Sequence, residues 1–248
     1  MLDLGLLVTM VVLWAGLAAA ARWLPITSYE RADVLDQLYG PALAGLVVGR
    51  LTAVLLDDPE SLGSIRALLV VRSGVEFWAG VAVFLALLRR SVVRRHRRRG
   101  HEALAELAPY ALWGYALYEA TCGLRDGCYG PVSSLGLTPD GLADRHFPIG
   151  MAVGVAVAAL ALGVRHLRAA PAGDRLLLAV GGLAAIRAVA AVWLPHLGAG
   201  LTRQHEQSVA VAAAALGILG VRGWRRARHR TRTTSESLPV LKAGGGGG

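Results

Sequence analysis

Among the ionisable residues that lie inside long apolar stretches of this 248-residue chain, four could do chemistry: Arg50, Glu76, Glu119 and Arg187. A charged side chain at the centre of a bilayer costs about 2.5–3.5 kcal/mol, so such residues face a bundle interior and indicate a functional site. A guanidinium group stays charged and matches the geometry of phosphate. A carboxylate becomes a stronger base where burial raises its pKa. These residues predict a phosphate-binding pocket with Arg50 and Arg187 as its cations and Glu76 or Glu119 as its base.

The same side chains also allow a purely structural interpretation. The two arginines and two glutamates can neutralise one another and hold helices together. Arg72 and Glu76 are four residues apart and share a helical face, so they can satisfy each other. Glu119 and Cys122 form either a base and a thiol nucleophile or a carboxylate beside a small apolar filler. A disulfide between Cys122 and Cys128 is a third possibility.

The elements that must position these residues are membrane helices. The chain is 54% hydrophobic and 17% charged, with a mean hydropathy of +0.49, which excludes disorder for most of its length and disfavours a soluble enzyme. Seven apolar stretches can be distinguished: Leu4–Ala21, Pro41–Leu56, Leu68–Leu88, Ala103–Cys122, Ile149–Val164, Leu176–Leu194 and Val209–Val221. The sequence therefore predicts an all-α, polytopic membrane protein with seven transmembrane helices.

Basic residues predict the orientation of these spans. Of 26 Lys and Arg residues, 19 lie after the first, third, fifth and seventh stretches. Positive loops stay cytoplasmic, so we expect the N-terminus outside and the C-terminus inside. The same clustering between spans explains the net charge of +9 without a nucleic-acid partner. Arg50 and Arg187 would lie about 10 Å below the outer surface, in a site that opens toward the outer leaflet.

The two ends of the chain carry their own predictions. The first stretch resembles a secretory signal, but its leading residues contain Asp3 and no basic residue, which favours an uncleaved span. Residues 1–230 form the predicted membrane domain. Residues 231–248 are polar and then glycine-only, and we expect a disordered cytoplasmic tail. His146 and His205 fall in outer loops without ligand spacing, so neither a metal site nor a cofactor is predicted.

Several segments resemble the bacterial prolipoprotein diacylglyceryl transferase family. Residues 45–56, which contain Arg50, resemble its second span; residues 71–80 resemble its third; residues 114–130 resemble its signature region. Arg187 occupies the place of its sixth-span arginine, and Tyr129 and Gly130 are retained. The resemblance implies seven spans in a bacterial plasma membrane. It also implies transfer of diacylglyceryl from phosphatidylglycerol to the cysteine of a lipoprotein signal peptide, in lipoprotein biosynthesis.

The chain departs from the family pattern at six positions. Gly127 and Ala191 replace family glutamates, Leu4 falls near the place of a family tyrosine, and the other three lie in the resembling segments. Trp78 replaces the family histidine, Glu119 replaces the signature arginine, and Cys122 replaces an asparagine. Together with Tyr129 and Gly130, Trp78 and Cys122 would line the pocket. Three interpretations follow: an active transferase that uses Glu76 or Glu119 as base, a weak or inactive paralogue that binds phospholipid or lipoprotein precursors, or a different lipid transferase or transporter on the same scaffold.

Overall fold

The computed structural model describes residues 4–23, 31–63, 75–95, 100–125, 129–138, 143–194 and 202–236, which are mostly helical. Their α-helices are α1 (Leu4–Trp23), α2 (Arg31–Asp57), α4 (Phe77–Arg95), α5 (Gly100–Ala120), α6 (Ile149–His166), α7 (Ala172–Ala191) and α8 (Arg203–Glu236). Two 3-10 helices, η1 (Pro59–Gly63) and η2 (Cys122–Arg125), and two strands, β1 (Tyr129–Leu137) and β2 (His146–Pro148), complete the described elements.

Each predicted apolar stretch overlaps one of these α-helices, although residues 68–74 of the third stretch lie outside the described residues. Within the described part of the chain, three helices are long and apolar enough to cross a membrane: Asp33–Asp57, Ile149–His166 and Arg203–Arg228. A shorter apolar helix covers Leu7–Arg22. These helices support a membrane protein.

Two details differ from the prediction. The chain is not all-α, because β1 and β2 pair antiparallel between α5 and α6, with Tyr129 opposite Pro148. Gly130, Pro131 and Gly136 disfavour a helix at this point. In addition, α8 continues to Glu236, into the predicted tail, because no glycine or proline interrupts residues 224–236. Residues 237–248 lie outside the described residues.

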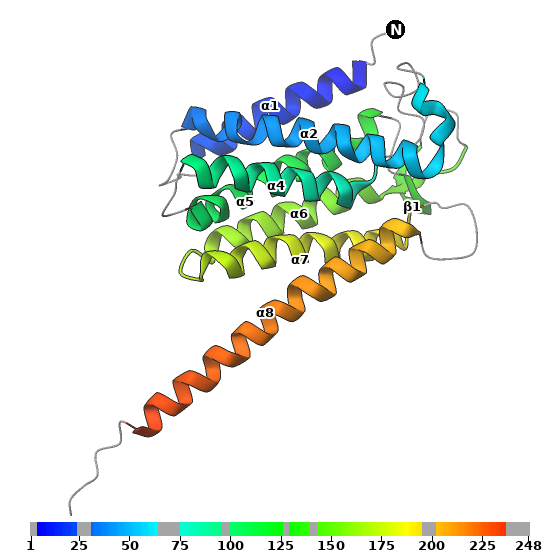
Figure 1. Ribbon diagram of the computed structural model, residues 1–248. Coiled ribbons are helices and arrows are strands. Elements are labelled where there is room, and N and C mark those ends of the chain that lie inside the picture. The colour runs from blue at the N-terminus through cyan, green and yellow to red at the C-terminus, as the bar shows by residue number, and fades with distance from the viewer. Residues whose placement is uncertain are drawn as a thin grey trace, which may run out of the picture.

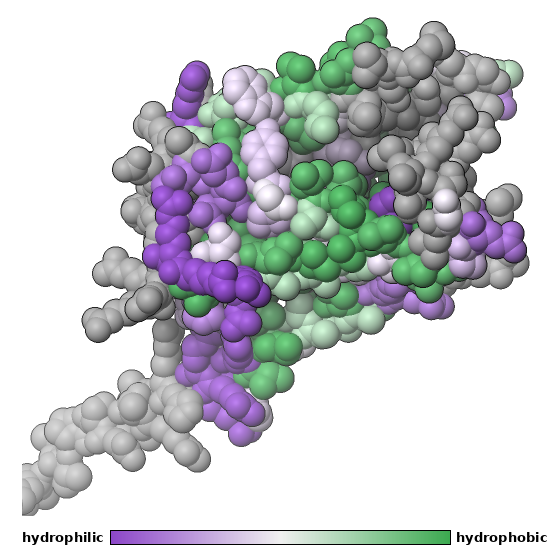
Figure 2. Space-filling model, turned by 45° about the horizontal axis from the view of Figure 1, so that its top comes forward, coloured by the Kyte–Doolittle hydropathy of each residue, from purple (hydrophilic) through white to green (hydrophobic). Residues whose placement is uncertain are grey.

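The helices form a bundle in which successive helices run back and forth. The start of α1, the β1–β2 hairpin and the start of α8 lie at one end, which we call the hairpin end (Figure 1). The second half of α8 extends past the other helices at the opposite end (Figure 1). Figure 2 shows hydrophobic residues across the middle of the molecule, with hydrophilic residues to either side. Leu43 and Val155 are 64% and 71% exposed, as expected for side chains that face lipid.

Glycines bring α2 and α4 into backbone contact. A Cβ atom on Gly45 would lie 2.7 Å from the carbonyl oxygen of Gly80, and one on Gly49 would lie 2.9 Å from that of Glu76. Gly45 and Gly49 have the four-residue spacing of small residues at membrane-helix contacts. The amide of Glu76 also donates to the carbonyl of Gly49 at 3.0 Å. This contact therefore fixes where Glu76 lies at the start of α4.

Asp174 at the start of α7 connects α7 with the second half of α8. Its carboxylate pairs with Arg226 and lies 3.7 Å from Nη1 of Arg222. The Asp174 side chain is 11% exposed, whereas both arginines are about half exposed. The pairing supplements the glycine contact of Gly181 with Ala215 and Leu216.

Replacement of Asp174 by asparagine is expected to loosen this half of α8. Partly exposed ion pairs stabilise by about 1 kcal/mol, so trypsin cleavage at the α8 arginines should accelerate about fivefold. Limited proteolysis of the purified protein measures the rate. Asp144→Asn, at an exposed position outside the helices, is the matched control. Equal cleavage rates in the two variants would contradict a role for the pair.

Candidate functional site

A cavity of about 360 Å³ lies at the hairpin end of the bundle, where α2, α5, α6, α7, α8 and the residues just before α4 meet. Its polar lining consists of Asp57, Glu76, Glu119, Thr202, Arg203, Gln204, Ser208 and Arg187. Its apolar lining comes mainly from α6 and α7, including Ile149, Val153 and Leu194. Three carboxylates and two guanidinium groups thus face one space beside an apolar wall.

Arg187 of α7 is held from three sides. Its Nη1 donates to the Tyr115 hydroxyl and lies 3.6 Å from Oε1 of Glu119. Its Nη2 donates to Oε1 of Gln204 at 3.2 Å, and its guanidinium carbon lies 3.7 Å from the centre of the Phe77 ring. Within the described residues its Nε has no hydrogen-bond partner. The guanidinium is therefore oriented by protein contacts and keeps one donor available.

Tyr115 lies between Arg187 and Glu119. Its hydroxyl accepts from Arg187 and donates to Oε1 of Glu119, which follows it by one helical turn on α5. The side chains of Arg187 and Glu119 are 16% and 17% exposed. Because the environment is poor in water, the carboxylate compensates the arginine strongly. Glu119 therefore serves to hold Arg187 in place.

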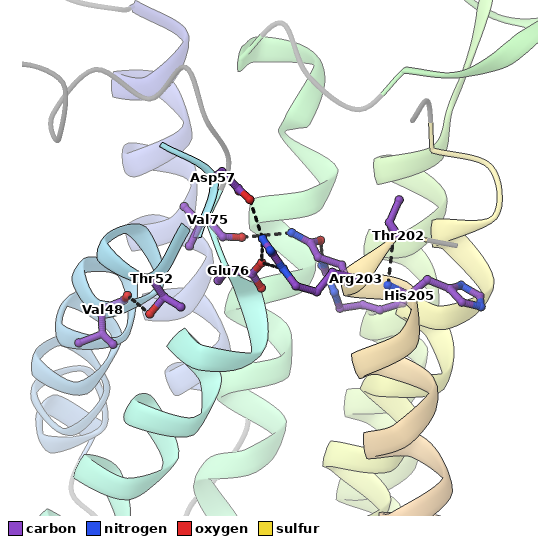
Figure 3. A network of polar contacts seen from close by, with 10 residues as sticks. Val48, Thr52, Asp57, Val75, Glu76, Thr202, Arg203 and His205 are labelled. Carbon is purple, nitrogen blue, oxygen red and sulfur yellow. Dashed lines mark hydrogen bonds and ion pairs between the residues drawn. The ribbon is translucent and has the colours of Figure 1, made fainter. Parts of the chain in front are cut away.

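Glu76 forms a second charged cluster with Arg203 and Asp57 (Figure 3). Oε1 of Glu76 accepts from Nε of Arg203 at 2.5 Å, and Nη2 of Arg203 reaches Oδ1 of Asp57 at 2.9 Å. The Glu76 side chain is 4% exposed, whereas Arg203 is 42% exposed. Oε2 of Glu76 has no hydrogen-bond partner in the described part of the chain. One carboxylate oxygen of this cluster is thus buried with its hydrogen-bonding capacity unused by the described residues.

The start of α8 is tied to α4 by two further side chains. Nε2 of Gln204 donates to the carbonyl of Val75 at 3.2 Å. Nε1 of Trp78 donates to the hydroxyl of Ser208 at 2.9 Å, and that hydroxyl donates to the carbonyl of Gln204 at 2.6 Å. Gln204 also contacts Arg187, so it links the two charged clusters.

Three of the predicted site residues meet in the cavity: Glu76, Glu119 and Arg187. Arg50 is 8% exposed and lies one turn before Ala53 of the lining, but it does not itself line the cavity. The proposed Arg72–Glu76 pair involves a residue outside the described residues, and Glu76 pairs with Arg203.

The four residues expected as pocket lining are placed elsewhere. Trp78 points to Ser208 of α8. Cys122 is buried and disulfide-bonded, so it offers no thiol nucleophile beside Glu119; Cys128 lies outside the described residues. Tyr129 and Gly130 begin β1, where the carbonyl of Gly130 lies 2.9 Å from Nδ1 of His146. They build the hairpin beside the cavity.

Sequence reasoning missed Asp57, Tyr115, Arg203 and Gln204. Asp57 and Arg203 lie outside the apolar stretches of the sequence, although Asp57 ends α2 and Arg203 begins α8. For Gln204, the available signal is its four-residue spacing from Ser208, which puts two polar side chains on one helical face just before an apolar run.

The cavity combines an oriented cation with carboxylates, an arrangement that can bind a phosphate group and accept a proton. In the described residues no three His, Cys, Asp or Glu side chains are grouped to hold a metal ion. No model of a known protein family matches this chain, and no curated protein is significantly similar to it in sequence.

Proposed function

We propose that this chain crosses a bacterial plasma membrane seven times, with its N-terminus outside and its C-terminus in the cytoplasm. The distribution of arginines supports this orientation, because basic loops stay cytoplasmic. The disulfide at Cys122 supports it independently, since it lies at the hairpin end and disulfides persist in oxidising compartments. The cavity would then face the outer leaflet.

We further propose that the cavity binds the headgroup of a phospholipid and that the protein transfers its diacylglyceryl group to the cysteine of a lipoprotein signal peptide. The observation that carries this proposal is Arg187, an oriented guanidinium with an unpartnered Nε in a cavity that also contains the buried carboxylate of Glu76. The resemblance of residues 45–56 and 114–130 to the diacylglyceryl transferase family names phosphatidylglycerol as the donor.

The residues have separate roles in this reaction. The thiol of the incoming cysteine loses its proton to Oε2 of Glu76, and its sulfur forms a bond with the terminal glyceryl carbon of the lipid. The carbon–oxygen bond to phosphate breaks, and glycerol phosphate leaves. Arg187 stabilises the charge on that phosphate, and Glu119 and Tyr115 keep Arg187 oriented.

The test uses the full chain reconstituted in phosphatidylglycerol vesicles with a signal-peptide substrate. Mass spectrometry should detect a diacylglyceryl thioether on the peptide, and none when phosphatidylcholine is the only lipid. Glu76→Gln should lower the rate about 100-fold or more, because a general base contributes roughly 10²–10⁴-fold. Glu102→Gln makes the same change at an exposed position on α5, and this control variant should retain activity. Absence of product with the wild-type chain would exclude the transferase.

A non-catalytic phospholipid-binding protein is the second candidate. The observation that favours it is the pairing of each cavity arginine with a carboxylate, Arg187 with Glu119 and Arg203 with Glu76. Such pairing weakens the stabilisation of a departing phosphate. In the same vesicles this candidate predicts retention of phosphatidylglycerol that depends on Arg187, together with no thioether.

A further inference from the structure

A second cavity, a shallow and widely open one of about 450 Å³, lies on α4 beside Gln37 of α2, at the end opposite to the hairpin end. Its lining consists of Gln37, Leu87, Arg90, Ser91, Arg94 and Arg95. Five of these residues belong to one face of α4, at the spacing of three and four residues that places side chains side by side on a helix. The site shares no residue with the cavity that contains Arg187.

The charges in this second cavity are of one sign. Arg95 pairs with Asp33 at 2.6 Å, whereas Arg90 and Arg94 have no hydrogen bond or ion pair with any described residue. No carboxylate belongs to its described lining. Two exposed guanidinium groups, one helical turn apart and without a partner among the described residues, suit an anion with several oxygens, such as a phosphate.

Polar and apolar groups complete the cavity around these arginines. Oγ of Ser91 donates to Oε1 of Gln37 at 2.7 Å, and Gln37 is 9% exposed. This bond occupies the oxygen of the amide, so its nitrogen is left to donate to a ligand. Leu87 lies on the same face, one turn closer to the middle of α4 than Arg90 and Ser91. Along α4 the lining thus changes from cationic at Arg94 to apolar at Leu87, in the same order as the headgroup and the acyl chain of a lipid.

The position of the cavity along α4 fits a lipid headgroup. Arg94 follows Glu76 by 18 residues, a rise of about 27 Å in a helix. The hydrocarbon core of a bilayer is about 30 Å thick. The two cavities therefore lie at opposite headgroup levels if α4 crosses the membrane.

We propose that Arg90 and Arg94 bind the phosphate group of an anionic phospholipid in the cytoplasmic leaflet. The same chemistry would suit a soluble phosphorylated compound, but Leu87 and the depth of the site favour the lipid. This binding requires the membrane orientation proposed above and does not require the transferase reaction.

The test measures phosphatidylglycerol binding by native mass spectrometry of the full chain released from detergent. All variants carry Arg187→Ala, so that the outer cavity does not contribute. Arg90→Gln combined with Arg94→Gln should lower the affinity about tenfold or more, because hydrogen bonds to charged groups are stronger than those between neutral groups. Arg89→Gln combined with Arg225→Gln removes the same charge at exposed positions outside the cavity and should leave the affinity unchanged.

Three outcomes would overturn the proposal. Equal losses in the two double variants would show that only net charge attracts the lipid. Unchanged binding in Arg90→Gln/Arg94→Gln would show that the cavity does not hold it. Displacement of the lipid by an equal concentration of glycerol 3-phosphate would identify a soluble phosphate compound as the ligand. Thioether formation should persist when Arg90→Gln and Arg94→Gln are introduced into the chain that retains Arg187, so a failure of this proposal is distinguishable from a failure of the transferase.

Discussion

Replacement of Arg187 by alanine is expected to weaken phosphatidylglycerol binding in the cavity at the hairpin end by roughly 10- to 100-fold. A hydrogen bond to a charged group contributes about 1.5–3 kcal/mol, and this guanidinium is largely withdrawn from water, with 16% of its side chain exposed. Its Nε is buried and has no protein partner in the described residues. Lipid titration of the reconstituted protein, followed by native mass spectrometry, measures the loss.

Two variants make this result specific. Arg187→Lys keeps the charge but loses the planar fork, so it should recover only part of the affinity. Arg203→Ala should weaken binding less than Arg187→Ala, because Arg203 is 42% exposed and its donors are engaged by Glu76 and Asp57. Equal losses for Arg187→Ala and Arg203→Ala would contradict a headgroup site at Arg187. Thermal unfolding of each variant separates lost binding from lost folding.

Replacement of Gly45 by alanine is expected to destabilise the bundle by about 1–3 kcal/mol, the usual cost of overpacking. The added Cβ would meet the carbonyl oxygen of Gly80 at 2.7 Å and the Cβ atom of Phe84 at 3.2 Å. Backbone atoms cannot rotate away as a side chain can, so α2 and α4 must separate. Gly45→Val should cost more, and thermal unfolding in detergent measures both variants.

Gly40→Ala is the matched control on the same helix. A Cβ on Gly40 would meet no atom within 4 Å, so this change should be neutral or stabilise by up to about 1 kcal/mol through helix propensity. A similar loss in both variants would contradict the α2–α4 contact. Because the contact positions Glu76 at Gly49, Gly45→Val should also reduce transferase activity in the protein that remains folded.

The two cavities give α4 a role at both of its ends. Glu76, directly before α4, belongs to the cavity at the hairpin end, and Arg90, Arg94 and Arg95 line the cavity at the opposite end, the inner cavity of the proposed orientation. A lipid bound at the inner cavity would contact α2 and α4 together, because Gln37 lies on α2. Anchoring at this end would hold the α2–α4 pair at a fixed depth and thereby keep Glu76 near the outer headgroup layer.

The helices were predictable because the hydropathy of a stretch of consecutive residues does not depend on tertiary contacts. Apolar stretches of about 20 residues cannot leave their backbone groups unsatisfied in lipid, so they form helices whatever their neighbours are. The cost of a charge in such a stretch likewise marked Glu76, Glu119 and Arg187 as members of a site. The β1–β2 hairpin and the extension of α8 to Glu236 were missed, because short strands and helix ends depend on local turns and contacts that hydropathy does not report.

The sequence by itself determined which segments are helical, which end of the bundle carries the arginines, and which buried charges need partners. Only the tertiary structure decided the partners: Glu76 pairs with Arg203, Arg187 pairs with Glu119 through Tyr115, and Arg50 lies outside the cavity lining. The reason is rotational. Each residue turns a side chain by about 100° around a helix axis, so the direction it faces depends on how helices pack, and contacts such as Gly45 against Gly80 set that packing.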